Sequence, residues 1–269
     1  MRVAVVGHVE WVEFLRVPHV PAPGQIVHTT ECWSEPAGGG AVAAVQLAKL
    51  AGSAGFFTAL GDDELGHRAF EELIGLGLRV HAAWRDEHQR RAETFVDDRG
   101  ERTITVIGDR LVPRGSDPLP WDELGTADGV YFTGGDVGAL RAARAARVLT
   151  ATPRTFETLR DAHVELDALI GSGRDPGETY DPAELDPPAR LRVSTLGHDG
   201  GIVEPGGPFA AAPTPGPVVD AYGAGDSFAA GLTFGLAAGM TVPDAVALAS
   251  RCGAAALTGR GAFAGQLEL

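Results

Sequence analysis

The sequence has very little of several residue types on which common sites depend. Lysine occurs once, at Lys49, and asparagine does not occur at all, whereas arginine supplies nearly all the positive charge. This bias is typical of a GC-rich genome rather than of selection at single sites. The two cysteines, Cys32 and Cys252, form neither a C-x-x-C nor a Cys/His spacing, which excludes a disulfide framework and a structural zinc site. A reducing cytoplasm is therefore expected.

An excess of positive charge is also missing. Acidic side chains outnumber basic ones 36 to 22, which gives a net charge of −14, so nucleic acids and anionic lipid surfaces are repelled on average. There is no apolar run of membrane-spanning length, and the apolar stretch Val3–Val6 is too short for a signal peptide. We expect a soluble, unprocessed protein without nucleic-acid or membrane partners. Its 269 residues, 44% of them hydrophobic, are enough to bury a full-sized core.

Short apolar runs alternate with helical patterns along the chain. Buried strands are predicted at Val3–Val6, Phe56–Leu60, Gly129–Thr133, Arg147–Ala151, Ala168–Gly171 and Arg192–Leu196. Helices are predicted at Ala41–Leu50, Glu64–Leu76, Asp226–Ala238 and from the capping box at Thr241 to about Leu257. This alternation predicts an α/β fold with a mostly parallel central sheet flanked by helices.

Two stretches interrupt the alternation. Ile26–Trp33 and Glu93–Ile107 are rich in Thr, Val and Ile with polar alternation, and Asp98-Arg99-Gly100 in the second is a hairpin turn. We expect a single domain over residues 1–269 that carries a small antiparallel β lid, formed by about 10–36 and 88–110. A half-exposed lid commonly packs on a partner, which favours a homodimer through the lid. Surface loops are expected at Asp175–Pro188 and Pro205–Pro217.

The strongest chemical signal is the segment from Asp220 to Asp226, D-A-Y-G-A-G-D, followed at once by a helical pattern. Gly223 and Gly225 allow a sharp turn and close approach of a ligand, and the free N–H groups of the first helical turn form an anion site. Asp226 stands beside that site, where the helix dipole favours its ionised form and lets it accept a proton. Phosphoryl transfer is the reaction that this arrangement predicts.

Other nucleotide sites are excluded. There is no G-x-x-x-x-G-K-[ST] motif, and Lys49 lies inside a predicted helix, which excludes P-loop and protein-kinase machinery. No G-x-G-x-x-G follows the first strand, where Gly7 stands alone, so a nicotinamide-dependent Rossmann enzyme is excluded too.

The D-x-x-G-A-G-D segment resembles the C-terminal signature of the ribokinase family, also called the PfkB carbohydrate kinases. The resemblance implies a ribokinase-like fold, Asp226 as catalytic base, and the backbone of Gly223, Ala224 and Gly225 as anion hole. It further implies ATP and Mg²⁺ as cofactors, a monovalent cation such as K⁺ near Asp220, and a sugar-like small molecule as substrate.

Further motifs follow the order of that family along the chain. Gly38, Gly39 and Gly40 resemble its N-terminal glycine pair, and Gly61-Asp62-Asp63-x-x-Gly66 resembles its G-x-D-x-x-G turn. Residues implied to bind the nucleotide are Thr195, Gly197 and Gly200 of a T-x-G-x-x-G loop, Asp220 of the signature, and Cys252 and Ala255 of a small-residue helix.

The chain departs from the family where the sugar is held. An aspartate and an asparagine of the family are replaced by Val12 and Val42, which offer no hydrogen bond. Glu10 shares strand parity with Val12 and is expected to reach the pocket, whereas Glu13 is expected to face away. His8, which follows the glycine after the first strand, is a further candidate for substrate contact.

The family's N-x-x-E motif, which orders water around magnesium, is also altered. The chain has Ser172-Gly173-Arg174-Asp175 there, with Glu178 slightly beyond. Asp175 and Glu178 are the expected carboxylates near the metal. Arg90, Arg91 and Arg102 on the lid are candidates to cover the transferring phosphoryl group.

The sequence thus predicts an ATP-dependent kinase that phosphorylates a hydroxyl of a sugar or sugar-like molecule. A nucleoside kinase is an alternative, because Val12, Val42, Trp11 and Phe14 suit a flat base. The altered motifs leave a second alternative, a catalytically impaired pseudokinase that binds a metabolite or nucleotide.

Overall fold

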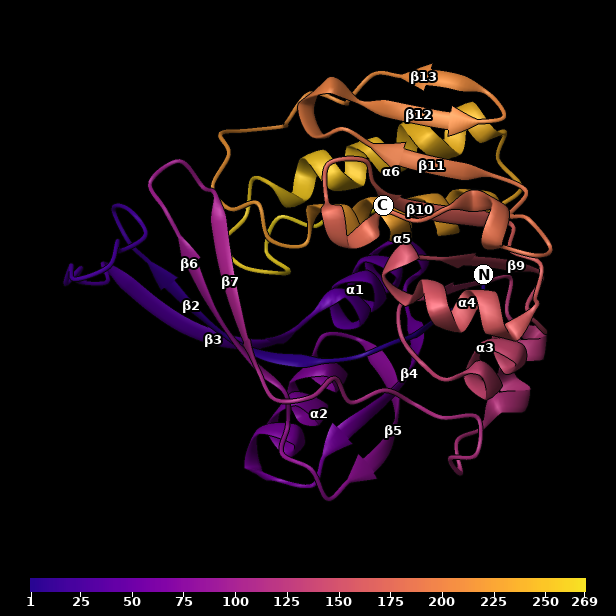
Figure 1. The fold of residues 1–269 in the computed structure, drawn as a ribbon, viewed down its shortest axis with the longest axis horizontal. Helices are drawn as coiled ribbons and strands as arrows, with labels where there is room; N and C mark the ends of the chain where they lie inside the picture. Colours follow the sequence, from indigo (N-terminus) through magenta and orange to yellow (C-terminus); the bar gives the residue numbers. More distant parts are fainter.

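A mostly parallel sheet of nine strands forms the centre of the molecule, as predicted (Figure 1). The computed structural model describes all residues, 1–269. The strand order is β13 (Gly207–Phe209), β12 (Gly201–Glu204), β11 (Arg192–Thr195), β10 (Ala168–Ser172), β9 (Val148–Ala151), β8 (Gly129–Phe132), β1 (Val3–Val6), β4 (Ala54–Gly61) and β5 (Leu78–Arg85). All pairings from β5 to β11 are parallel, and β12 and β13 continue the sheet antiparallel.

Helices cover both faces of this sheet because successive residues of a buried strand point to opposite faces. One core contains Val3 and Val5 of β1 and packs against α1 (Gly39–Ala51), α2 (Glu64–Gly75), α5 (Ala224–Ala237) and α6 (Val242–Ala256). The other core contains Ala4 and Val6 and packs against α3 (Val137–Ala143) and α4 (Phe156–Ala162).

A second sheet projects to one side of the body as a lid (Figure 1). Its order is β3 (Glu31–Ala37), β2 (Glu10–Arg16), β6 (Arg91–Val96) and β7 (Arg102–Ile107), within the two stretches expected to form the lid. The β2/β3 and β6/β7 pairs are antiparallel, and a parallel pairing of β2 with β6 joins them. The turn between β6 and β7 falls at Asp98–Gly100, as predicted.

Two local predictions are wrong. The strand expected at Ile26–Trp33 begins only at Glu31, because its partner β2 ends at Arg16 and Pro18 follows. The Pro205–Pro217 stretch is not wholly loop, since it contains the edge strand β13, where Pro208 is tolerated. Strands β5 and β12 and the short helices α3 and α4 were not predicted from the sequence.

Candidate active site

The loop before α5 presents an open helix N-terminus. Gly223 is left-handed (φ 74°), and a β-carbon on it would lie 2.8 Å from Cγ1 of Val42. Val42 is fully buried, so its side chain packs beneath this loop and is not exposed to a substrate. A β-carbon on Gly225 would meet nothing within 4 Å. Since the first N–H groups of a helix have no intrahelical partner, the loop can bind an anion above Gly225.

The carboxylate of Asp226 lies where this loop meets the N-terminus of α1. A β-carbon on Gly39 would stand 2.8 Å from Asp226 Oδ1. The N–H of Gly38 donates to Tyr222 Oη at 3.1 Å, and a β-carbon on Gly40 would come within 2.7 Å of the His8 backbone N. The predicted glycines therefore let the N-terminus of α1 lie close to the segment after β1 and to the signature loop, and Gly39 is the one that meets Asp226.

Burial raises the pKa of Asp226 to about 6, and the negative charge of Glu178 adds to this shift, while Arg102 and Arg154 oppose it. The expectation that the helix dipole dominates is thus wrong in direction, because desolvation of the carboxylate outweighs it. At pH 7 the group is still mostly ionised. A carboxylate titrating close to neutral pH is a stronger proton acceptor than an ordinary aspartate.

Asp220 braces the signature loop from below. Its carboxylate is fully buried and accepts the N–H groups of Tyr222 at 2.9 Å and Gly261 at 3.1 Å. Beside it, Glu35 of the lid accepts the N–H of Ala262 at 2.6 Å. Burial raises the pKa of both carboxyl groups. Asp220 therefore ties the loop to the segment after α6.

The lid is joined directly to the signature loop. Gly100 O accepts the N–H of Ala221 at 3.0 Å, and Arg102 donates to Ala221 O at 2.8 Å. Arg16 of β2 donates to Val219 O at 3.2 Å. Of the three lid arginines singled out in the sequence, Arg102 is the one that contacts this loop. Arg91 is exposed on the outside of the lid, and Arg90 lies with Glu10 instead.

A cavity of about 630 Å³ opens beside Gly225. Thr195, Gly197 and Gly200, expected at a nucleotide site, line it together with Ala224. Its further lining residues are Glu101, Arg174, His198, Phe209, Ala211, Ala212, Pro213, Thr214, Val218, Ala221, Phe228, Ser250, Gly253, Ala254 and Leu257.

Cys252 and Ala255 do not line this cavity, which corrects the prediction for the small-residue helix. The stripe of α6 that faces the cavity consists of Ser250, Gly253, Ala254 and Leu257, at helical spacing. Cys252 is fully buried on the other side, where a β-carbon on Gly231 would lie 2.8 Å from its sulfur. Burial raises the pKa of this thiol to about 12.

The cavity suits a nucleoside phosphate. Phe209 and Phe228 stack with their centroids 5.8 Å apart at its apolar part, where a base can pack. Ala224 and Gly225 of the helix N-terminus lie at the same cavity, where the dipole favours phosphate. Glu101, in the turn between β6 and β7, also lines the cavity, so the lid forms part of the cavity wall.

The G-x-D-x-x-G turn is bonded to the two segments that lead into the lid. Asp63 caps α2 through the N–H of Gly66 at 2.9 Å and also accepts the N–H of Gln89 at 3.0 Å. Gln89 in turn donates to Val9 O at 2.9 Å. A β-carbon on Gly66 would overlap the carbonyl oxygen of Gly61. The motif therefore fixes where the chain enters the lid.

Asp175 and Glu178 do not form a metal site of their own. Both carboxylates are ion-paired with Arg154, and Glu178 Oε2 also accepts the N–H of Ser172 at 2.6 Å. No three His, Cys, Asp or Glu side chains lie together in a way that could hold a metal ion. Arg154 follows β9 and was not predicted as a site residue, because it belongs to no sequence motif.

The residues expected at the substrate lie at the base of the lid. Glu10 is buried on the same side as Val12, and Glu13 is exposed. Glu10 Oε1 lies 2.7 Å from Arg90 Nε and 3.7 Å from His8 Nε2. Burial, and then the charge of Arg110, lowers the pKa of His8 well below its usual value, so its ring is neutral at pH 7.

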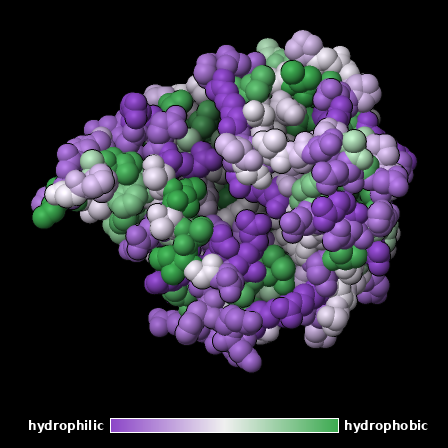
Figure 2. Space-filling view, viewed as in Figure 1, coloured by the Kyte–Doolittle hydropathy of each residue, from purple (hydrophilic) through white to green (hydrophobic).

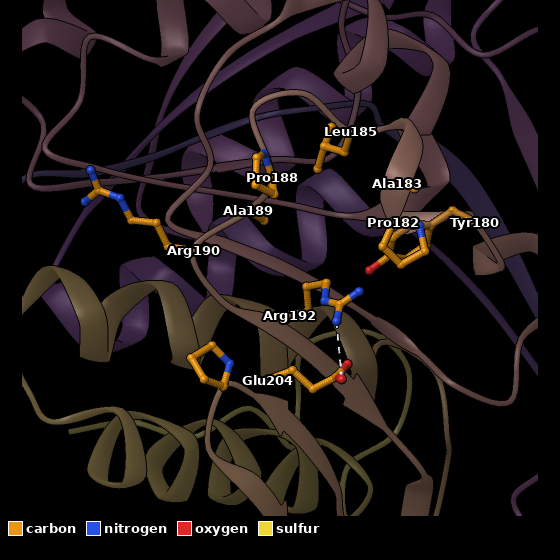
Figure 3. Close-up of a pocket in the computed structure, with 10 residues that line it drawn as sticks. Tyr180, Pro182, Ala183, Leu185, Pro188, Ala189, Arg190, Arg192 and Glu204 are labelled. Carbon is orange, nitrogen blue, oxygen red and sulfur yellow. Dashed lines mark ion pairs between the residues drawn. The ribbon is translucent and has the colours of Figure 1, made fainter.

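A second cavity, of about 400 Å³, lies away from Asp226 (Figure 3). Its lining includes Tyr180 and Arg192, and the Arg192 side chain is ion-paired with Glu204 at 3.2 Å. Arg190, which also lines it, is paired with Glu165. No signature residue reaches this cavity, and its charges are already compensated.

No helix of the chain has both the length and the apolar character needed to cross a bilayer.

Comparison with known proteins agrees with this geometry. Residues 1–161 and 163–268 match the family model described as "pfkB family carbohydrate kinase". The chain is similar to fructoselysine 6-kinase of Escherichia coli, with 31% identity over 84% of this chain and 91% of the relative. It is also similar to the ATP-dependent ribose-1-phosphate kinase of Halopiger xanaduensis, with 30% identity over 94% and 91%.

The fold is that of ribokinase. The ribokinase structure from Giardia lamblia matches with a TM-score of 0.80 and 18% identity, covering 99% of this chain and 96% of that one. The family model covers almost every residue, including the signature loop, the glycines of α1 and the lid. The chain belongs to the pfkB family of carbohydrate kinases.

Proposed function

We propose that this protein is an ATP-dependent kinase that transfers the γ-phosphoryl group to a hydroxyl of a sugar or sugar-like acceptor. The observation that carries the proposal is the position of Asp226. Its carboxylate stands between the nucleotide cavity, at Gly225, and the cluster of His8 and Glu10 at the lid. Phosphotransfer needs the donor and acceptor on either side of one base.

The residues divide the reaction between them. Asp226 accepts the proton of the acceptor hydroxyl as its oxygen bonds to the γ-phosphorus, and the bond from that phosphorus to the β,γ-bridging oxygen breaks to release ADP. The N–H groups of Gly223, Ala224 and Gly225 stabilise the charge that spreads over the phosphoryl oxygens. The lid, which is hydrogen-bonded to the signature loop, excludes water from this step.

Magnesium neutralises phosphate charge when it is bound with ATP. Since the chain gathers no cluster of three ligand side chains, we propose that the ion arrives with the nucleotide and that Glu178, with Asp175, bonds its waters. Asp220 and Glu35, two buried carboxylates bound to backbone N–H groups, are the groups that would face a monovalent cation such as K⁺.

The buried valines argue for a sugar over a nucleoside. Val12, Val42 and Phe14 have no exposed surface, and Trp11 is 6% exposed. Phe14 stacks on Trp33 and meets the ring of Tyr222 edge-on, each with centroids 5.0 Å apart. Phe14 packs the lid against the signature loop, and the other three residues are buried as well, so these four offer no exposed apolar face to a base.

ADP release from Mg-ATP in the presence of sugars, sugar phosphates and nucleosides tests the proposal. Acceptor-dependent release is expected with a sugar-type compound, and Asp226→Asn should lower turnover by about 100-fold or more while nucleotide binding persists. Full activity in that variant would overturn the role of Asp226. Nucleotide binding without turnover for any acceptor would instead indicate the pseudokinase.

We further propose a homodimer through the lid. Strand β7 is exposed along its whole length at an open sheet edge, and Ile104 and Val106 on its inner face are 42% and 49% exposed. Hydrophobic side chains gather beside the hollow at the lid in Figure 2. A second lid would cover both the face and the edge. Sedimentation should show a dimer that Ile104→Ser with Val106→Ser dissociates, and a wild-type monomer at all concentrations would contradict it.

The free thiol of Cys32 is exposed, and the reaction consumes ATP. An exposed free thiol suits a reducing compartment, and a kinase needs a compartment that contains ATP. We therefore propose that the protein works in the cytoplasm.

A further inference from the structure

Positive charge gathers at the base of the lid of a strongly acidic protein. The chain has a net charge of −14, yet Arg110, Arg90 and Arg154 all act on His8 through their charges. They come from different segments: Arg90 precedes β6, Arg110 follows β7, and Arg154 follows β9. Arg90 and Arg110 therefore lie on the segments that connect β6 and β7 to the body of the protein.

Carboxylates pair with two of these three arginines but not with Arg110. Arg154 is paired with Asp175 and Glu178, and Arg90 lies with Glu10, their side chains being only 12% and 10% exposed. The half-buried guanidinium of Arg110 has no hydrogen bond or ion pair, and among acidic groups only Glu10 acts on it through its charge. A half-buried cation without a partner is costly, and such a group is commonly kept for a ligand.

The neighbouring polar groups are also left open. Nδ1 of His8 is buried without a hydrogen-bond partner and faces Gly134, where a β-carbon would lie 3.6 Å away. Nε of Arg90, although 2.7 Å from Glu10, is not aligned for a hydrogen bond with it. Buried polar groups are normally satisfied, so these atoms indicate a ligand at this place.

We propose that the acceptor is a sugar that already carries a fixed negative group, a phosphate or a carboxylate, and that Arg110 and Arg90 bind this group. A neutral sugar hydroxyl can accept a hydrogen bond from Arg110 but cannot neutralise it. The positions that would grip neutral hydroxyls, Val12 and Val42, are apolar and fully buried. Recognition of the acceptor therefore falls to charge rather than to hydroxyl contacts, with Glu10 orienting Arg90.

This inference rests on the proposed kinase activity, and its test compares acceptors as matched pairs. Ribose is measured against ribose 1-phosphate, fructose against fructose 6-phosphate, and glucose against gluconate. At least one charged member should exceed its neutral parent in kcat/KM by about 100-fold, the scale of a charge-assisted bidentate contact. The phosphate and carboxylate arms show which anion is used. Equal kcat/KM within every pair would overturn the inference.

Variants separate binding of the anion from folding. Arg110→Gln should raise KM for the charged acceptor by about tenfold or more and leave KM for ATP unchanged, and Arg110→Lys should restore part of the loss. Arg91→Gln is the matched control, because Arg91 adjoins Arg90 but is exposed on the outer face of the lid. Equal effects of Arg110→Gln and Arg91→Gln would contradict the assignment.

Binding by calorimetry to Asp226→Asn provides a readout without turnover. Ribose 1-phosphate or gluconate should bind this variant, and adding Arg110→Gln should weaken that binding. If no acceptor supports ADP release but this binding is observed, the kinase proposal fails and the anion site stands. If neutral sugars are turned over and no charged sugar binds, the anion site fails and the kinase stands.

Discussion

Gly39 lies directly against the carboxylate of Asp226, so that a β-carbon at Gly39 would stand 2.8 Å from Oδ1. The N-terminus of α1 therefore sets the position of the base as much as α5 does. This contact explains why glycine is needed at Gly39 although its backbone is not left-handed.

Gly39→Ala is predicted to displace the Asp226 carboxylate and lower kcat by about 10- to 100-fold, because small misplacements of a reacting group are costly. Unfolding stability should change by less than about 1 kcal/mol, since alanine favours helix at this position. Gly75→Ala, in open space at the end of α2, is the control and should leave kcat unchanged. Parallel kinetics and thermal melts test this, and an unaltered kcat in Gly39→Ala would contradict it.

The acid limb of the pH profile is predicted to report Asp226. Because its pKa is raised to about 6, kcat/KM should rise with pH through about 6 and level off above it. Glu178→Gln removes the negative charge that contributes to this shift, so the limb should move to lower pH. The amide oxygen still accepts the Ser172 N–H, which keeps the loop in place.

Glu184→Gln is the control for this experiment. Glu184 lies on the same loop as Glu178, but it is exposed and is paired with Arg160. Its pH profile should match the wild type. A limb that stays in place in Glu178→Gln would show that the charge of Glu178 does not reach the base.

Asp226→Asn is predicted to stabilise the fold while it removes activity. The pKa of Asp226 is about 6 in the native state and near 3.8 when unfolded, so above pH 6 ionisation of this carboxyl favours the unfolded state. The penalty shrinks as the pH falls from 6 toward 3.8 and vanishes well below pH 3.8, where both states are protonated. Asparagine should therefore gain roughly 1–2 kcal/mol at pH 8, a rise in Tm of about 2–6 °C, and little at pH 4. Equal melting temperatures at pH 8 would refute a raised pKa.

The sequence predicted the framework of the fold well because β1, β4, β8, β9 and β10 are largely apolar runs between helical patterns. Strand β11 was also predicted, although Val193 is its one apolar residue. It failed where local composition resembles a loop, as at β12 and β13, whose Gly and Pro residues are tolerated at an antiparallel edge. The lid was found from its polar alternation, but the partner of each strand depends on tertiary pairing.

The candidate site was predictable where residues adjoin in sequence, as in the loop from Asp220 to Asp226. Arg110 and Arg154 were missed because they are far apart in the chain, and arginines are usually solvated. The direction of the Asp226 pKa shift was also missed, since desolvation depends on what packs over the carboxylate and not on its place in a helix.

The hydrogen bond from Arg102 to Ala221 O is predicted to couple the lid to the catalytic base, Asp226. Arg102→Ala should lower kcat/KM by about tenfold, the scale of a hydrogen bond to a charged group, and should move the acid limb to higher pH because the charge of Arg102 lowers the pKa of Asp226. Amides of the 97–102 turn should exchange faster. Arg99→Ala changes a side chain on the same turn that is 82% exposed and pairs with Asp97, and it should leave kcat/KM and the acid limb unchanged.

The face of α6 that binds nucleotide is predicted to be the one containing Ala254. Ala254→Phe places a ring in the cavity of about 630 Å³ and should raise KM for ATP by about tenfold or more. Cys252→Ala removes a sulfur packed against Gly231 and should lower stability by about 1 kcal/mol without changing KM for ATP. Ala254 lines the cavity and Cys252 is buried on another face of α6, so the pair compares the two faces of the helix. A raised KM in Cys252→Ala with none in Ala254→Phe would mean that the helix turns its other face to the nucleotide.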